Sequence, residues 1–294
     1  MLERRYQSFL MTEFRRSWRV AGLFILLGRK ERRNTAMKKQ VMVLLALVLW
    51  ILCAFVAVGL YQYPWGPGQR KDICVMTYFD GGGKMAGSVG AVAMANKKRY
   101  CEIHDYRFFQ EDTSLDPERA ASWVKLLHVQ RRLMDPGCQW VFFMDADTLI
   151  TNANVSLESI VEGRSEDIFF AKDSIAVVNG GVFITRRTPY VVTFLTRVYS
   201  QTYFINHGWW EQAAIQYIIN SKDPRDEGRI AILPQRTMNS FWPLPGWFPS
   251  NEERRAEIFW QRGDFMVHFA SRPNPKEHWN VTEFILSYQE DILV

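Results

Sequence analysis

One apolar run without charged residues divides this 294-residue chain and restricts how it can fold. The run, Val41 to Tyr61 (VMVLLALVLWILCAFVAVGLY), contains no Asp, Glu, Lys or Arg. At about 1.5 Å per residue, a helix of this length matches a hydrocarbon core of ~30 Å, so we expect a transmembrane helix. A cleaved signal peptide, with translation starting at Met37, is the alternative, although the run exceeds the ~7–15 apolar residues usual there.

Charge is distributed unevenly around this run. Residues 1–40 carry 11 Lys and Arg against 3 Asp and Glu, whereas the other residues carry 25 against 28. Because basic residues accumulate on the cytosolic side of membrane helices, we expect a cytosolic tail (1–40), a signal anchor (41–61) and a luminal remainder. The remainder lacks a surplus of basic side chains, which argues against a nucleic-acid partner.

The luminal part should consist of a short stem (62–71), rich in Pro and Gly, and one catalytic-sized domain (72–294). Two glycosylation sequons, at Asn154 and Asn280, fit a luminal position. Three cysteines lie in the domain, Cys74, Cys101 and Cys138, so at most one disulfide can form within it, and which of them pair stays open.

Apolar runs alternate with helical segments at the start of the domain. Strands are expected at Ile73 to Phe79, Tyr106 to Gln110 and Trp140 to Met144, with helices from Met85 to Tyr100 and from an Asp116-Pro117 start to Leu133. This order predicts an α/β fold, a parallel-centred sheet with helices on both faces. Ligands gather at the carboxyl ends of such strands, where Asp80 and the Asp145/Asp147 pair would lie.

The motif Asp145-Ala146-Asp147 follows a strand whose apolar composition predicts burial. Two carboxylates there need a cationic partner, and a divalent ion with oxygen ligands is the economical one. His268, in an apolar alternating stretch, could complete a site for Mn²⁺, with Mg²⁺ as the alternative ion. The competing interpretations are two carboxylates that cap a turn and a histidine that belongs to the core.

Other candidate positions also have structural interpretations. Asn179-Gly180-Gly181 allows a close approach of the backbone to a ligand, or forms a bulge. Glu211 and Gln212 open a short helix (213–219) and could project towards a site from its first turn, or be solvated. Arg272 could contact a phosphate through its guanidinium, and Lys125, on the polar side of its helix, would ordinarily be solvated.

Tryptophans are concentrated late in the domain. Five of the 11 lie between residues 209 and 260: Trp209, Trp210, Trp242, Trp247 and Trp260. Aromatic faces pack on the apolar C–H faces of sugars, and they also fill protein cores.

Several sequence blocks, taken in order, resemble the luminal glycosyltransferases of family 34, which include fungal α-galactosyl and α-mannosyl transferases of the Golgi and plant xyloglucan xylosyltransferases. The resemblance runs from about Asp72 to Tyr288 and rests on the blocks NKKRYCEIHDYRFF (96–109), SWVK (122–125), 140–148, Asn179-Gly180-Gly181, Glu211-Gln212, ILPQR (232–236) with Asn239-Ser240, and GDF (263–265) with His268-Phe269.

The resemblance implies a GT-A-like fold and transfer of a hexose or pentose from a UDP- or GDP-sugar to a glycan, with retention of configuration. Asp145 would then meet the donor ribose or metal-bound water, and Asp147 and His268 would ligate Mn²⁺. Lys125 and Arg272 would hold donor oxygens. Glu211 and Gln212 would lie near the anomeric carbon, although relatives usually carry Asp in place of Glu211. Such enzymes are type II membrane glycoproteins of the Golgi or ER, and complexes with other Golgi transferases are expected.

Two other functions compete with this interpretation. A strand followed by Asp-X-Asp also begins phosphohydrolases of the haloacid dehalogenase type, but those have Thr or Val where this chain has Leu149. A non-catalytic, sugar-binding relative that serves as a partner subunit is the second alternative, and the intact set of Asp145, Asp147 and His268 argues against it.

Overall fold

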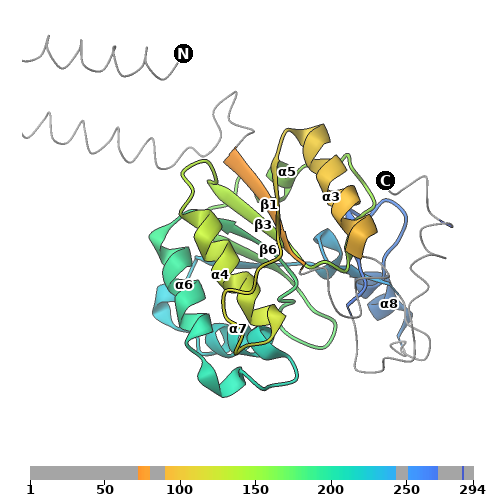
Figure 1. The fold of residues 1–294 in the computed structure, drawn as a ribbon. Coiled ribbons are helices and arrows are strands. Elements are labelled where there is room, and N and C mark those ends of the chain that lie inside the picture. The colour runs from red at the N-terminus through yellow and green to blue at the C-terminus, as the bar shows by residue number, and fades with distance from the viewer. Residues whose placement is uncertain (1–71, 80–89, 243–250, 271–286, 288–294) are drawn as a thin grey trace, which may run out of the picture. The chain divides into compact units, whose positions relative to one another are not determined.

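A computed structural model describes residues 72–79, 90–242, 251–270 and 287 (Figure 1). The expected anchor at 41–61, the tail and the stem lie outside these residues, as do Asp80, Trp247, Arg272 and Asn280. Within the described part of the chain, no helix combines the length and the apolar character that a membrane span requires.

A six-stranded sheet forms the centre of the domain, in the order β2-β1-β3-β6-β5-β7. Its strands are β1 (Ile73–Tyr78), β2 (Arg107–Glu111), β3 (Trp140–Met144), β5 (Ile168–Ala171), β6 (Val182–Arg186) and β7 (Ile230–Leu233). The first three agree with the expected strands to within about a residue at each end.

Helices cover both faces of this sheet, as the sequence predicts (Figure 1). Alternate residues of β1 and β3 point to opposite sides: Cys74 and Val141 pack with α4 (Ala121–Leu133), α6 (Pro189–Tyr199) and α7 (Trp210–Asn220). Ile73 and Trp140 belong to the other core, with α3 (Gly90–His104) and α5 (Leu157–Val161).

The sheet is mixed rather than wholly parallel, and β6 is the strand that departs from the parallel arrangement. This strand runs antiparallel to both β3 and β5, whereas the β1–β2, β1–β3 and β5–β7 pairs are parallel. A parallel neighbour needs a crossover of a dozen or more residues, usually a helix, and only the loop 172–181 joins β5 to β6. The short connection therefore makes β6 turn back along β5.

The expected start of α4 at Asp116-Pro117 is also wrong. The helix begins at Ala121, after Ala120, without a capping side chain. The Asp116 carboxylate instead accepts hydrogen bonds from the Tyr199 hydroxyl and the Glu118 amide. Asp116 therefore caps the turn that precedes α4 and also joins this turn to the end of α6.

A small second sheet brings distant parts of the chain to the edge of the large one. Its order is β4-β9-β8, formed by β4 (Thr148–Ile150), β9 (Met266–His268) and β8 (Ser240–Phe241). Thr148 pairs with His268 in the antiparallel β4–β9 ladder, and the Phe269 amide donates to the Asp147 carbonyl at 2.9 Å. The ladder thus places His268 beside the Asp145-Ala146-Asp147 motif.

One disulfide joins Cys74 of β1 to Cys138, just before β3, and Cys101 is a buried free thiol. The described structure thus contains the single bridge that the sequence allows.

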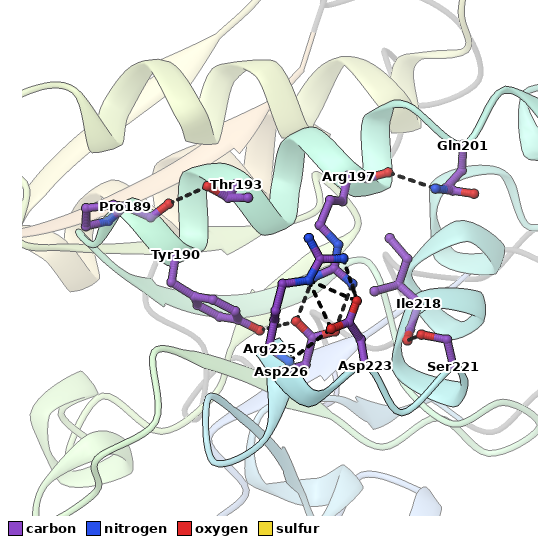
Figure 2. A network of polar contacts seen from close by, with 10 residues as sticks. All are labelled: Pro189, Tyr190, Thr193, Arg197, Gln201, Ile218, Ser221, Asp223, Arg225 and Asp226. Atoms are coloured by element: carbon purple, nitrogen blue, oxygen red, sulfur yellow. Dashed lines mark hydrogen bonds and ion pairs between the residues drawn. The ribbon is translucent and has the colours of Figure 1, made fainter.

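Short one-turn helices complete the chain, η3 (Thr202–Phe204), η4 (Pro224–Asp226) and η5 (Gln235–Thr237), together with α8 (Glu252–Ile258). Figure 2 shows how η4 is attached to α6. Arg197 donates to Asp226 at 2.7 Å and to Asp223 at 3.2 Å, and the Tyr190 hydroxyl also donates to Asp226. The network holds the segment that leads from α7 into β7.

Candidate functional site

The antiparallel pairing of β3 and β6 assembles the candidate site. The carboxyl end of β3 lies beside the amino end of β6, with Met144 opposite Val182. The Asp145 amide donates to the Gly181 carbonyl at 2.8 Å. The acidic motif after β3 and the glycines before β6 therefore meet at one edge of the sheet, and the β4–β9 ladder adds His268.

Asp145, Asp147 and His268 each offer one ligand atom, and these atoms lie within 4.8 Å of one another. His268 Nε2 is 3.3 Å from Asp147 Oδ1, and the imidazole is buried whereas the two carboxylates are half-buried. Two carboxylates and an imidazole suit a first-row divalent ion such as Mn²⁺. The structure thus unites the three residues that the sequence analysis named as metal ligands.

Asn239 orients the His268 ring. Its Nδ2 donates to the Lys172 carbonyl at 3.1 Å, which turns its Oδ1 towards His268 Nδ1, 2.7 Å away. An amide oxygen only accepts hydrogen bonds, so Nδ1 carries a proton, and Nε2 is the ring nitrogen that can bind a metal ion. A second partner of this kind fixes the tautomer of most metal-binding histidines.

Gly181 is required by the close packing around the acidic motif. A Cβ at this position would lie 2.5 Å from Asp145 Oδ2 and 2.8 Å from His268 Cε1. The Gly181 amide donates to Asn179 Oδ1 at 2.8 Å, and Asn179 Nδ2 donates to Asp173 at 2.9 Å. The Asp145 and His268 side chains therefore pack closely on the Gly181 backbone, and the expected approach of this backbone to a ligand stays a prediction.

Lys125 is buried rather than solvated. Its ammonium lies 3.1 Å from Asp145 Oδ1 and 2.9 Å from Glu211 Oε1, and it donates to the Gly180 carbonyl at 3.0 Å. Burial would lower the pKa of Lys125, but the Asp145 and Glu211 carboxylates raise it above its ordinary value. The three protein acceptors match the three N–H bonds of the ammonium, so Lys125 links the acidic motif to α7.

Glu211 and Gln212 open α7, as expected, and both point to Gly180. Glu211 is buried, and burial raises the pKa of its carboxyl group in opposition to Lys125. Gln212 Oε1 accepts a hydrogen bond from the Gly180 amide at 2.9 Å. One turn further along α7, Gln216 Oε1 accepts from the Val177 amide at 2.9 Å, so two glutamines of this helix hold the loop 172–181.

Lys97 is a site residue that the sequence analysis included in a block without assigning it a role. Its side chain is fully buried, and Nζ donates to the Asp145 carbonyl at 2.7 Å. Burial lowers the pKa of Lys97 to about 7, while Asp147 and Asp145 act in the opposite direction. A lysine in the run NKKRY on a helix resembles any solvated lysine, so only tertiary structure distinguishes it from Lys98.

The acidic pair has unequal proton affinities. Burial raises the pKa of Asp145 above its ordinary value, and the Lys125 ammonium opposes that shift. Burial acts in the same direction on Asp147, but the His268 imidazole outweighs it and lowers the pKa of Asp147. Two carboxylates this close repel each other, and a bound cation would relieve that repulsion.

Four of the five late tryptophans lie among the described residues, and they divide into two groups. Trp260 is buried and donates to the Thr151 hydroxyl at 2.8 Å, and Trp242 packs against it. Trp209 and Trp210 are exposed, next to Glu211. The core interpretation therefore holds for Trp242 and Trp260, whereas packing on a sugar stays a prediction for Trp209 and Trp210.

The sequence matches the galactosyl transferase GMA12/MNN10 family over residues 69–164 and 159–278. Probable glycosyltransferase 3 of Oryza sativa subsp. indica is 31% identical over 111 residues, which are 35% of this chain and 24% of that protein. An uncharacterized alpha-1,2-galactosyltransferase of Schizosaccharomyces pombe is 26% identical over 220 residues, 61% of this chain and 62% of that protein. The match thus spans about a quarter of the rice relative.

Solved structures share the fold. A glycosyltransferase involved in the glycosylation of the major capsid of PBCV-1 superposes with a TM-score of 0.54 at 16% identity, over 74% of this chain and 98% of that one. Apo GlyE of Streptococcus pneumoniae TIGR4 superposes with a TM-score of 0.50 at 12% identity, over 74% and 60%. The GT-A-like arrangement of sheet and helices agrees with this likeness, and the family match covers more than half of the chain. The chain therefore belongs to the galactosyl transferase GMA12/MNN10 family, which confirms the resemblance that its sequence blocks carry.

Proposed function

We propose that this chain is a metal-dependent, retaining glycosyltransferase that moves a hexose or a pentose from a nucleoside diphosphate sugar to a glycan acceptor. The observation that carries the proposal is the cluster of Asp145, Asp147 and His268, whose ligand atoms lie within 4.8 Å of one another. Two fission yeast relatives bear the name alpha-1,2-galactosyltransferase, which makes a galactosyl donor the first one to test.

The donor set of this cluster fits a divalent ion. Asp147 and His268 would hold it directly, since His268 Nε2 lies 3.3 Å from Asp147 Oδ1 while Nδ1 is engaged by Asn239. Asp145 would act on the donor ribose or through a metal-bound water, at a position fixed by Lys125 and Lys97. When bound, Mn²⁺ supplies Lewis-acid stabilisation to the departing nucleoside diphosphate, and Mg²⁺ is the alternative ion.

Lys125, Glu211 and Gln212 would organise the part of the site that faces the sugar. The Lys125–Glu211 pair joins the acidic motif to α7, so it keeps the two elements at a constant separation. Gln212 is half-buried, and its Nε2 forms no hydrogen bond with the residues that the structure describes. That amide is available to donate to a substrate oxygen near the anomeric carbon, the position proposed for Glu211 and Gln212.

Asn179, Gly180 and Gly181 would line the donor side of the site, with Asp80 and Arg272 contributing from segments outside the described residues. Arg272 follows β9 closely in the sequence and would bring a guanidinium to the diphosphate.

We further propose that the protein is a single-pass type II protein of the Golgi or ER membrane with a luminal catalytic domain. The disulfide between Cys74 and Cys138 fits an oxidising compartment, and Asn154 of the first sequon is exposed. Glycan on Asn154 and Asn280, and protection of the domain from protease in intact microsomes, would agree with this topology. Digestion of the domain together with unmodified sequons would contradict it.

The decisive experiment measures nucleotide release and sugar transfer by the full chain across UDP- and GDP-sugars, with Mn²⁺, Mg²⁺ or EDTA. We expect a metal-dependent reaction that Asp147→Asn and His268→Ala each reduce by about 10²-fold in kcat/KM, a loss of ~3 kcal/mol. Full activity in EDTA, or a His268→Ala enzyme with unchanged Mn²⁺ dependence, would remove this metal site from the reaction.

The same assay separates the alternative functions. Release of phosphate from phosphomonoesters without any use of sugar nucleotides would favour the phosphohydrolase. Donor binding without release of nucleotide, under all metal conditions, would favour a non-catalytic partner subunit.

A further inference from the structure

An exposed aromatic surface lies next to the candidate catalytic residues. Four side chains form it, here called the aromatic platform, with their exposed fractions: Tyr203 (87%), Trp209 (42%), Trp210 (45%) and Tyr217 (57%). Large apolar side chains that gather on a protein surface often mark an interaction site, whereas single exposed apolar side chains are common.

Phe204 and His207 connect three rings of the platform, those of Tyr203, Trp209 and Tyr217. Phe204, which packs on the core, contacts Tyr203 at 5.2 Å, Tyr217 at 5.5 Å and His207 at 5.8 Å between ring centroids. His207 in turn contacts the Trp209 ring at 6.0 Å and accepts a hydrogen bond from the Trp209 amide. A ligand that stacks on rings already fixed in this way loses less conformational freedom on binding.

Backbone geometry also maintains the platform beside the active site. Trp210 has φ of 40°, a left-handed conformation that is unusual for a residue with a Cβ. This residue exposes its ring while the next one, Glu211, is buried against Lys125. Trp210 and Tyr217 are two turns apart on α7, so the platform extends from the site along one face of the helix.

The scarcity of charged side chains in the segment that carries the platform limits the kinds of ligand that it can bind. Between Gln201 and Ser221 the only acidic or basic side chain besides His207 is Glu211, which is buried. An anionic membrane or a nucleic acid requires Lys and Arg side chains, which the segment lacks. A neutral sugar needs none, because the C–H faces of its ring pack on aromatic rings.

We propose that the aromatic platform binds a neutral oligosaccharide segment of the acceptor glycan and directs its end to Glu211 and Gln212. This inference rests on the proposed function. It assigns a role in acceptor binding to Tyr203 and Tyr217, which the sequence analysis did not single out. It excludes Trp242 and Trp260 from this role.

The test uses the full chain and the variants Trp209→Ala and Tyr217→Ala, with Trp209→Phe and Tyr217→Phe as conservative partners. Met134→Ala and Ile103→Ala are matched controls, since these side chains are exposed apolar residues at α4 and α3. Binding is measured by fluorescence anisotropy with labelled α-mannohexaose, β-glucohexaose and, as an acidic probe, hexagalacturonate. Acceptor KM and donor KM are measured separately.

We expect at least one neutral hexaose to bind, and each alanine variant to weaken that binding and raise the acceptor KM by about 5- to 10-fold. The donor KM should change less than twofold, the phenylalanine variants should retain most of the binding, and the controls should behave as the wild type. This pattern would be absent if the rings only stabilised the fold, because both KM values would then shift together with the Tm.

Several results would overturn the proposal. They are unchanged binding in the alanine variants, equal losses in the Met134→Ala control, preference for the acidic probe, or failure of all neutral hexaoses to bind. Loss of self-association or of vesicle binding in the variants, with an unchanged acceptor KM, would assign the surface to a second copy or to a membrane. A wild-type protein that binds a neutral hexaose on the platform but turns over no sugar nucleotide would refute the proposed function and leave standing only the binding of a neutral oligosaccharide.

Discussion

The Asn239 carboxamide determines which nitrogen of His268 carries the proton: its Oδ1 lies 2.7 Å from Nδ1, and its own Nδ2 is held by the Lys172 carbonyl. The imidazole therefore presents Nε2 to Asp147 without having to change tautomer. Metal binding at this cluster should depend on a residue that does not itself touch the ion.

Asn239→Ala should weaken Mn²⁺ binding by about 10- to 100-fold, as the loss of such a partner does at other histidine ligands. Isothermal titration of the full chain measures the effect. Asn220→Ala, at an exposed position of α7, is the control. Equal Mn²⁺ affinities of the Asn239→Ala and Asn220→Ala variants would show that the tautomer needs no support.

Gly181→Ala should disrupt the site while the fold survives. The new Cβ would lie 2.5 Å from Asp145 Oδ2 and 2.8 Å from His268 Cε1, so both side chains must move. A displacement of about 1 Å in a reacting site can cost about 10²-fold in rate, and we expect a loss of that size in kcat/KM. The matched control is Gly208→Ala, whose Cβ meets nothing within 4 Å. Retention of activity by Gly181→Ala would contradict the packing described for this edge of the sheet.

Lys125→Met should destabilise the protein strongly. The Lys125–Glu211 pair is almost fully buried, with 4% of each side chain exposed, so the variant leaves a buried carboxylate without its cation. Loss of one partner of a buried pair costs about 3–5 kcal/mol, which urea unfolding at pH 7 measures.

Two controls make this test specific. The double variant Lys125→Met/Glu211→Leu should be more stable than Lys125→Met alone, because it removes the more deeply buried of the two carboxylates that lose their cation. Arg99→Met breaks an exposed pair with Glu102 and should cost at most about 1 kcal/mol. A double variant no more stable than the single one would argue that Lys125 acts through packing alone.

The network around η4 should make stability sensitive to acid (Figure 2). Hydrogen bonds from the Arg225 side chain, and from its amide, hold the pKa of Asp223 below its ordinary value of 3.8. Because the folded-state pKa is the lower one, the stabilisation is complete above the ordinary value and is lost as the pH falls below it.

Asp223→Asn should therefore flatten the dependence of Tm on pH between about pH 4 and pH 2. Calorimetric scans across this window provide the measurement. Asp112→Asn is the control, since that carboxylate forms no ion pair within the described residues. Parallel Tm curves for wild type and Asp223→Asn would mean that the network contributes nothing measurable.

Local patterns in the sequence predict much of this domain correctly. Apolar runs such as Trp140 to Met144 are long enough for one strand and too short for most helices. The strands β1, β2 and β3 can therefore be predicted from residue type and from the turn-forming residues that flank them. The acidic motif after β3 and the glycines before β6 are also visible in the sequence. Carboxylates that directly follow a buried strand are costly to desolvate, so their position alone predicts a cationic partner, and Lys125 is one such partner of Asp145.

Most of the first strands, the acidic motif and the residue types available as metal ligands can be predicted from the sequence, because these depend on neighbours in the chain. How they meet depends on the tertiary structure. The reversal of β6 brings Gly181 to Asp145, the β4–β9 ladder brings His268 to Asp147, and burial separates Lys97 and Lys125 from ordinary surface lysines. Strand direction, register and desolvation depend on groups that are far apart in the sequence, so a local sequence pattern does not predict them.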